Sequence, residues 1–229
     1  MGFFSKLFGT YTFENHRVTI HKHGHRCYSE GLNFYEQSVV SILARNLNSN
    51  KYYLFNNVIL PCSNTKTTQI DHVVVSEYGI FVIESKDYGG WIFGNRDRSK
   101  WTQSMKTGNK YQFQNPLHQN LAHVFALKEH LPFLKNCIYN VVVFSDRSEF
   151  KTPMPKTVMH DDEMVDYILE KSKPILSEGE LMMTIGKLSM LCQTKQVSNE
   201  EHVSNLSHAH SKKLNSSSNQ PPIELTSSK

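Results

Sequence analysis

Residues 69–94 read QIDHVVVSEYGIFVIESKDYGGWIFG, and the fold is built around this stretch. Two apolar runs rich in Val, Ile and Phe, residues 70–75 and 80–83, flank the short sequence Ser-Glu-Tyr-Gly. Because Gly79 falls where a tight turn favours a positive φ, the pattern predicts a β-hairpin. If the loop has two residues, Ser76 pairs with Gly79, and this pair sets the register of the whole hairpin.

That register brings charged residues together at the open end of the hairpin. Asp71 lies opposite Glu84, and such cross-strand partners have Cβ atoms about 4.5–5.5 Å apart. Two carboxylates this close repel each other unless a positive charge lies between them, and a hard cation such as Mg²⁺ suits an oxygen pair. Lys86 follows on the same face of the strand. The arrangement predicts a metal site with an ammonium group beside it; the alternative is a ladder of salt bridges without a ligand.

The composition indicates one domain with tails. The chain has 229 residues and a formal net charge of +4, which permits a nucleic-acid partner without requiring one. Its four cysteines are scattered without a CxxC pair, as is typical of a reducing compartment, so we expect a cytoplasmic protein. The apolar start, MGFFSKLFG, is too short for a signal sequence or a membrane span, and whether it contacts a membrane surface stays open.

A helix is predicted over residues 33–47. Its apolar stripe consists of Leu32, Val39, Val40, Leu43 and Leu47. Glu36 lies in the middle of this stripe, where a carboxylate must be paired, neutralised or bound to a metal. Equally, Asn33 can cap the helix with Glu36 as the third residue of a capping box. Both interpretations fit the spacing.

The remaining pattern indicates an α/β fold. We expect a strand over residues 52–60, a buried strand over 138–145 and helices over 161–169 and 177–192. Asn115 and Pro116 begin another helix, whose predicted buried stripe is Leu117, Leu121, Val124, Phe125 and Leu131. The expected order is therefore helix, three-stranded antiparallel meander, helix, further strand and C-terminal helices. We expect a lead-in over residues 1–28, one domain over 29–193 and a disordered polar tail over 194–229.

A basic segment follows the hairpin. Residues 96–110 contain one acid, Asp97, and five basic residues: Arg96, Arg98, Lys100, Lys106 and Lys110. Trp101 lies among them. Because basic groups neutralise phosphates and aromatic rings stack on bases, the segment predicts a nucleic-acid surface. A solvated loop with aromatic anchors fits the same residues.

Taken in order, these motifs resemble the nuclease-related domain, a branch of the PD-(D/E)xK restriction-endonuclease-like superfamily. The resemblance spans residues 31–145. Ser85 stands where the family more often has Thr, and Glu36 follows Tyr35 where the family usually has Gly-Glu. The residues that carry the resemblance are Gly31, Glu36, Asn57-Val58, Gln69-Ile70-Asp71-His72, Gly79 to Lys86, Gly90 to Gly94, Trp101 and Asn115 to Gln119.

The resemblance implies a restriction-endonuclease-like core that cleaves phosphodiester bonds with Mg²⁺ or Mn²⁺, and DNA is the substrate it favours. It implies that Asp71, Glu84 and the backbone carbonyl of Ser85 hold the cation. Glu36 would complete the ligand set, directly or through water. Lys86 would position or deprotonate the attacking water, or stabilise the developing anion.

Gln119 also matches a position of the family. Our helical count, however, places it opposite the buried stripe of its own helix, where it faces either substrate or solvent. Two other classes of function remain alternatives at this point. The domain can bind nucleic acid without cutting it, or it can be an interaction module in which the charged residues of the hairpin have a structural role only.

Overall fold

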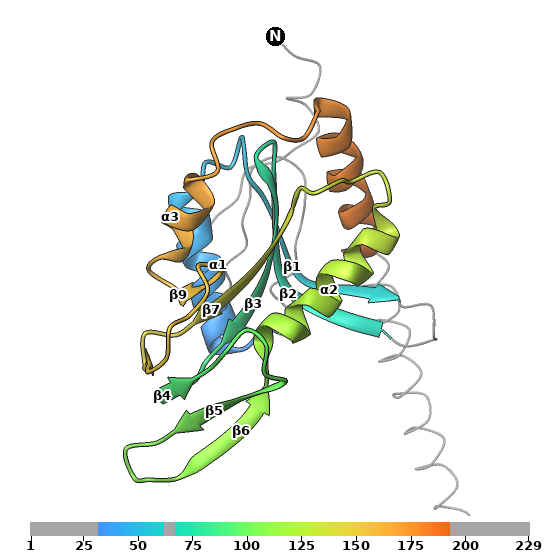
Figure 1. Ribbon diagram of the computed structural model, residues 1–229. Coiled ribbons are helices and arrows are strands. Elements are labelled where there is room, and N and C mark those ends of the chain that lie inside the picture. Colours follow the sequence, from blue (N-terminus) through green and yellow to red (C-terminus); the bar gives the residue numbers. More distant parts are fainter. Residues whose placement is uncertain (1–31, 62–66, 193–229) are drawn as a thin grey trace, which may run out of the picture. The chain divides into compact units, whose positions relative to one another are not determined.

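The computed structural model describes residues 32–61 and 67–192 (Figure 1). The expectations for the lead-in over residues 1–28 and the tail over 194–229 concern residues outside this part of the chain. Within it, no helix is both long enough and apolar enough to cross a membrane.

A five-stranded sheet lies at the centre of the fold, with strand order β1-β2-β3-β7-β9. The first three strands form the predicted antiparallel meander, and the last two add in parallel orientation. This arrangement confirms the expected α/β class and the expected order of the core elements. The bounds are β1 (Tyr53–Pro61), β2 (Thr67–Ser76), β3 (Gly79–Lys86), β7 (Ile138–Phe144) and β9 (Val158–His160).

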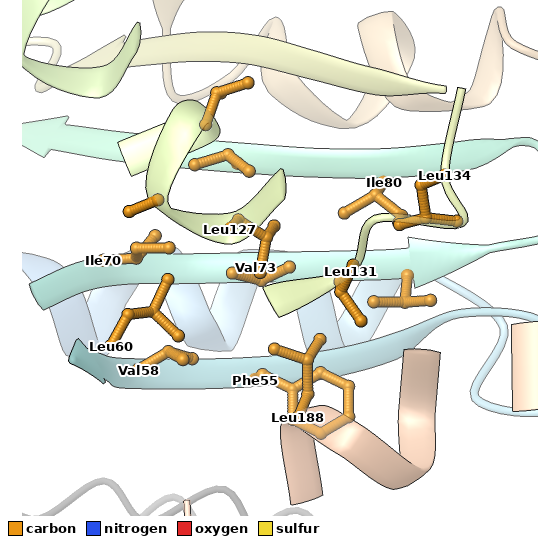
Figure 2. Close-up of a cluster of buried hydrophobic side chains, with 14 of the residues drawn as sticks. Phe55, Val58, Leu60, Ile70, Val73, Ile80, Leu127, Leu131, Leu134 and Leu188 are labelled. Atoms are coloured by element: carbon orange, nitrogen blue, oxygen red, sulfur yellow. The ribbon is translucent and has the colours of Figure 1, made fainter. Parts of the chain in front are cut away.

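Helices cover both faces of this sheet (Figure 1). Helices α1 (Phe34–Asn46) and α3 (Met164–Leu169) pack on one face, where Val39 and Ile168 contact the cluster around Phe81. Helix α2 (Pro116–His130) and a helix over residues 178–192 pack on the other face. Figure 2 shows Leu127 and Leu188 of these helices in one cluster with apolar side chains of the strands, among them Phe55, Val73 and Ile80. Burying each such side chain contributes about 1.5–3 kcal/mol, so two apolar layers hold the sheet in place.

The buried face of α2 differs from the predicted one. Leu121 and Phe125 are 39% and 57% exposed, whereas Asn120 and His123 are buried. The helix is therefore rotated about its axis relative to the apolar count. The physical reason is that these two polar side chains have hydrogen-bonding or charged partners on the sheet, which a count of apolar residues does not include.

A second sheet follows β3, with strand order β6-β5-β4-β8. Its strands are β4 (Gly90–Phe93), β5 (Lys100–Ser104), β6 (Lys110–Gln114) and β8 (Ser148–Phe150). The basic segment over residues 96–110, interpreted from sequence as a nucleic-acid surface or a solvated loop, contains β5 and leads into β6, and these two strands form a hairpin. One face of this sheet packs on the core through Ile92 and Trp101, which contact Phe144 of β7 in one apolar cluster.

Candidate active site

Side chains of β2 alternate between the two faces of the sheet, and this alternation is interrupted around Asp71. Ile70 and Val73 are three positions apart, yet both belong to the apolar cluster under α2. In the neighbouring strand, Asn57 has a φ of 53°, a left-handed conformation that Asn adopts more readily than most residues. The irregular residue lies opposite Asp71, between the pairs Asn56↔His72 and Val58↔Ile70. The carboxylate of Asp71 reaches across to Ser85 of β3.

The carboxylate of Asp71 takes the place of a ladder acceptor between β2 and β3. The predicted register holds from the turn to the pair His72↔Ile83, and its continuation places Asp71 opposite Glu84. At that level, Oδ2 of Asp71 accepts hydrogen bonds from the backbone N–H of Ser85 at 2.9 Å and from its Oγ at 3.0 Å. The carboxylate of Asp71, which belongs to β2, is therefore held beside Ser85 near the C-terminal end of β3.

Glu84 joins three side chains at this point, although it is only 2% exposed. Its Oε1 accepts hydrogen bonds from Nζ of Lys86 at 2.5 Å and from Nε2 of Gln119 at 2.6 Å. Oε1 of Gln119 in turn accepts from Nζ of Lys86 at 3.1 Å. Gln119 thus contacts both charged residues of β3. Its side chain points into the candidate site, a point that the helical count left open.

His123 lies on the other side of Glu84. Its Nε2 is 3.3 Å from Oε2 of Glu84, within ion-pair distance but without the alignment of a hydrogen bond. Its Nδ1 is 2.8 Å from Oγ1 of Thr68 on β2. The sequence reasoning missed His123 and Thr68. The available signal was spacing, because His123 follows Gln119 by four residues and so shares its side of α2.

Asn120 fixes the helix that carries these side chains. Its Nδ2 donates to the carbonyl oxygens of Val82 on β3 and Val141 on β7, at 2.8 and 2.9 Å. The same group is 2.8 Å from Oδ1 of Asn140. A fully buried amide with these acceptors holds α2 across the two strands. The preceding residue, Gln119, is thereby aimed at Glu84.

The two carboxylates have opposite electrostatic environments. Burial, followed by the negative charge of Glu84, raises the pKa of Asp71 from 3.8 to about 6, against the hydrogen bonds from Ser85. Burial also acts to raise the pKa of Glu84, but its contacts with His123 and Lys86 outweigh burial and hold that pKa below its ordinary value. Asp71 therefore carries an unfavourable interaction with its ionised neighbour that a cation would relieve.

The donor set fits a divalent cation that is only partly held by protein. Within the described ranges, no group of three His, Cys, Asp or Glu side chains is arranged to hold a metal. Mg²⁺, however, is commonly bound through one or two carboxylates, with water and substrate phosphate completing its ligands. Asp71 and Glu84 supply two carboxylates, and Oε2 of Glu84 is buried without a hydrogen-bond partner.

Glu36 forms the capping box that was the alternative to a metal role. Its Oε1 accepts from Nδ2 of Asn33 at 2.6 Å and its Oε2 from the backbone N–H of Asn33 at 3.0 Å. Oδ1 of Asn33 accepts from the backbone N–H of Glu36 in return. Both carboxylate oxygens are thus engaged at the start of α1. The structure gives no support to Glu36 as a ligand, although its charge contributes to the raised pKa of Asp71.

The loop between β4 and β5, residues 94–99, is tied to the start of α2; we call it the basic loop. Nδ2 of Asn115 donates to the carbonyl oxygens of Asn95, Arg96 and Arg98, at 3.2, 3.1 and 2.7 Å. Asn115 also caps α2, and Gln119 follows one turn later. The side chains of Arg96 and Arg98 are exposed. The hydrogen bonds from Asn115 thus hold the backbone of Arg96 and Arg98 at the start of α2, one turn before Gln119, which contacts Lys86.

The expectation that Trp101 contacts nucleic acid does not match its position. The residue is 1% exposed and stacks on Phe144, with ring centroids 6.1 Å apart and planes at 5°. Its Nε1 donates to the carbonyl oxygen of Asn95 at 2.9 Å. In this conformation Trp101 cannot stack on a base, so we assign it to the core. Lys106, in the turn between β5 and β6, and Lys110, the first residue of β6, are both exposed.

The raised pKa of Asp71 leads to a prediction for stability in the absence of metal. The folded state binds the Asp71 proton more tightly than the unfolded state, so this contribution is fully present below pH 3.8 and is lost as pH rises to about 6. The loss is at most about 3 kcal/mol. In urea unfolding with EDTA, the free energy of unfolding of Asp71→Asn should increase relative to that of wild type between pH 3.8 and about 6. At pH 7 the variant should be no less stable than wild type. A clear loss of stability at pH 7 would favour the salt-bridge ladder.

Comparisons with known proteins identify a family. The family model described as the nuclease-related domain matches residues 32–145, which include every residue of the site. An uncharacterized protein of Bacillus anthracis is 31% identical over 159 residues, covering 69% of this chain and 72% of the relative. No solved structure gives a significant match.

Proposed function

The chain belongs to the nuclease-related domain family, and we propose that it hydrolyses phosphodiester bonds of DNA with the help of a divalent cation. The observation that carries the proposal is the cluster at the end of β3. There Glu84 is shared between Lys86 and Gln119, and Asp71 lies on the neighbouring strand beside Ser85. Buried or half-buried carboxylates with perturbed pKa values beside an ammonium group are typical of catalytic sites.

The cation would be held by Asp71, Glu84 and the backbone carbonyl of Ser85. When bound, Mg²⁺ or Mn²⁺ lowers the pKa of a coordinated water molecule and neutralises charge on a phosphate. The fit rests on the two carboxylates and on Oε2 of Glu84, which is buried and accepts no hydrogen bond. His123, which lies beside that oxygen and contacts Thr68, would hold the Glu84 side chain in place.

Lys86 would act on the substrate side of the site. An ammonium group has three N–H donors and no acceptor. Two donors are directed at Glu84 and Gln119, which leaves a third for the attacking water or a phosphate oxygen. Gln119 orients the ammonium group through its amide oxygen and the carboxylate through its amide nitrogen. The proposed role of Lys86 is to stabilise the negative charge that develops during hydrolysis.

A digestion experiment tests this proposal. End-labelled DNA and RNA, each single-stranded and duplex, are incubated with the full chain and Mg²⁺, Mn²⁺ or EDTA. We expect cleavage of DNA with either cation and none in EDTA. Intact DNA under every metal condition would contradict the proposal, and faster cleavage of RNA would change the substrate.

The basic loop and its neighbour Lys100 are proposed to hold the phosphates of the substrate. Replacing Arg96, Arg98 and Lys100 together with Ala should weaken DNA binding and reduce its salt dependence, because fewer counterions are released. The slope of log K against log salt should fall by about 0.9 for each phosphate that is no longer neutralised. Folding should survive, since all three side chains are exposed. Fluorescence anisotropy in EDTA across a series of salt concentrations measures both quantities; an unchanged slope would place the phosphates elsewhere.

A further inference from the structure

The second sheet has one covered face and one open face. Directly paired residues of neighbouring strands point to the same face. The register places Ile92, Trp101 and Phe113 on the face that packs against the core. The opposite face, which we call the open face, carries Trp91 and Phe93 of β4, Lys100, Thr102 and Ser104 of β5, Lys110, Gln112 and Gln114 of β6, and Glu149 of β8.

Two aromatic rings lie at the centre of the open face. Trp91 and Phe93 are 37% and 38% exposed, on a strand that has neighbours on both sides. They are two residues apart, hence about 7 Å apart along the strand. Nε1 of Trp91 donates to Oε2 of Glu149 at 3.0 Å, which fixes the indole against the sheet. Both rings therefore keep more than a third of their surface exposed to solvent.

Positive charge surrounds these rings. Lys100 and Lys110 lie on the open face itself, and Lys106 lies in the turn beside it. Nζ of Lys151 is 5.2 Å from the centroid of the Trp91 ring. Among the described residues that we assign to this face, the one acid, Glu149, is ion-paired with Lys151. The excess of basic groups matches a polyanion and does not match an uncharged apolar partner.

We propose that the open face binds unpaired nucleotides of a single nucleic-acid strand. Bases would stack on Trp91 and Phe93, and the surrounding lysines would neutralise the phosphates. A single strand fits better than a duplex because the base faces of a duplex are already stacked and cannot meet the rings. The proposal rests on the proposed function and narrows its substrate class to nucleic acids with a single-stranded segment.

The chain connection between the open face and the candidate site supports this proposal. Strand β6 ends at Gln114, which pairs with Lys100 and leads directly into the Asn115 cap of α2 (Figure 1). Asn115 also holds the basic loop. A strand that leaves the open face at this end therefore meets the basic loop and then the first turn of α2, where Gln119 contacts Lys86.

The test measures binding of fluorescein-labelled oligodeoxythymidylate to the full chain in EDTA by anisotropy. Base stacking on an aromatic ring contributes enough that replacing both Trp91 and Phe93 with Ala should weaken binding at least about tenfold. Tyr111→Ala is the matched control, because Tyr111 is 54% exposed on the same sheet but lies on the opposite face, and its affinity should equal that of wild type. Thr102→Glu, which keeps both rings and adds a negative charge between the strands, should also weaken binding.

Intrinsic fluorescence gives a second readout. The chain has two tryptophans, and Trp101 is buried, so oligodeoxythymidylate should quench the emission of Trp91. Unchanged affinity in both the double variant and Thr102→Glu, or a loss as large for duplex DNA as for the single strand, would overturn the proposal. Cleavage assays separate it from the proposed function. If cleavage depends on Lys86 and replacing Trp91 has no effect, only the proposal for the open face is wrong. If binding depends on Trp91 but no cleavage occurs, only the proposed nuclease activity is wrong.

Discussion

Lys86→Ala should reduce DNA cleavage by on the order of 10²–10³ in rate while leaving metal and DNA binding nearly intact. The ammonium group contacts Glu84 and Gln119 but cannot coordinate a cation, so its removal deletes an interaction with the reacting phosphate or water and no metal ligand. Single-turnover cleavage of labelled DNA at saturating Mg²⁺ measures the rate. Anisotropy in EDTA measures DNA binding on the same substrate.

Lys51→Ala is the control for this prediction. Lys51 lies at the other end of the central sheet, where its Nζ is 3.4 Å from the hydroxyl of Tyr78, and its removal should leave the cleavage rate unchanged. If Lys86→Ala cuts DNA as fast as wild type, the proposed mechanism is wrong and the domain is better described as a binding module. An equal loss in DNA affinity would instead make Lys86 a binding residue.

Asp71→Asn should abolish binding of Mg²⁺ and Mn²⁺. The wild-type carboxylate gains a favourable partner when a cation binds, because burial and the charge of Glu84 raise its pKa to about 6 in the absence of metal. An amide of the same shape can still accept the hydrogen bonds from Ser85, so the fold should be retained. Isothermal titration calorimetry of both proteins with each metal salt measures the difference.

The control here is Asp166→Asn, an exposed carboxylate in the first turn of α3. It should bind metal as wild type does, which excludes a general effect of reduced negative charge. Metal binding by Asp71→Asn equal to that of wild type would remove Asp71 from the proposed ligand set. A wild type that binds no divalent cation would remove the site itself, because substrate-free binding is what the carboxylate pair is proposed to provide.

The part of the fold that could be predicted is the part in which apolar periodicity decides the structure. The hairpin register followed from one turn, and the strand over 138–145 followed from its continuous apolar run. The hairpin β5–β6 was missed because only one of its faces packs on the core. Its other face is polar and basic, so the segment has the composition of a loop although it pairs as strands.

The residues of the candidate site that lie on strands could be predicted from the sequence, whereas those on α2 could not. Asp71, Glu84 and Lys86 are related by strand register, which short-range sequence fixes. The direction of Gln119 depends instead on the rotation of α2, which is set by hydrogen bonds from a buried amide, Asn120, to backbone carbonyls distant in sequence. For the same reason His123 was not expected, since its partner Thr68 lies 55 residues away.

A Mg²⁺ titration of DNA cleavage, run on wild type and on Glu84→Gln, decides whether the cluster at the end of β3 is catalytic. Glu84 links the proposed cation ligands to Lys86, and Gln keeps its size and an acceptor oxygen for Lys86 and Gln119. We expect wild type to cleave in proportion to bound metal. Glu84→Gln should stay folded by circular dichroism, bind DNA and leave it intact at every Mg²⁺ concentration. Equal cleavage by the two proteins would show that the metal-dependent mechanism proposed for this cluster is wrong.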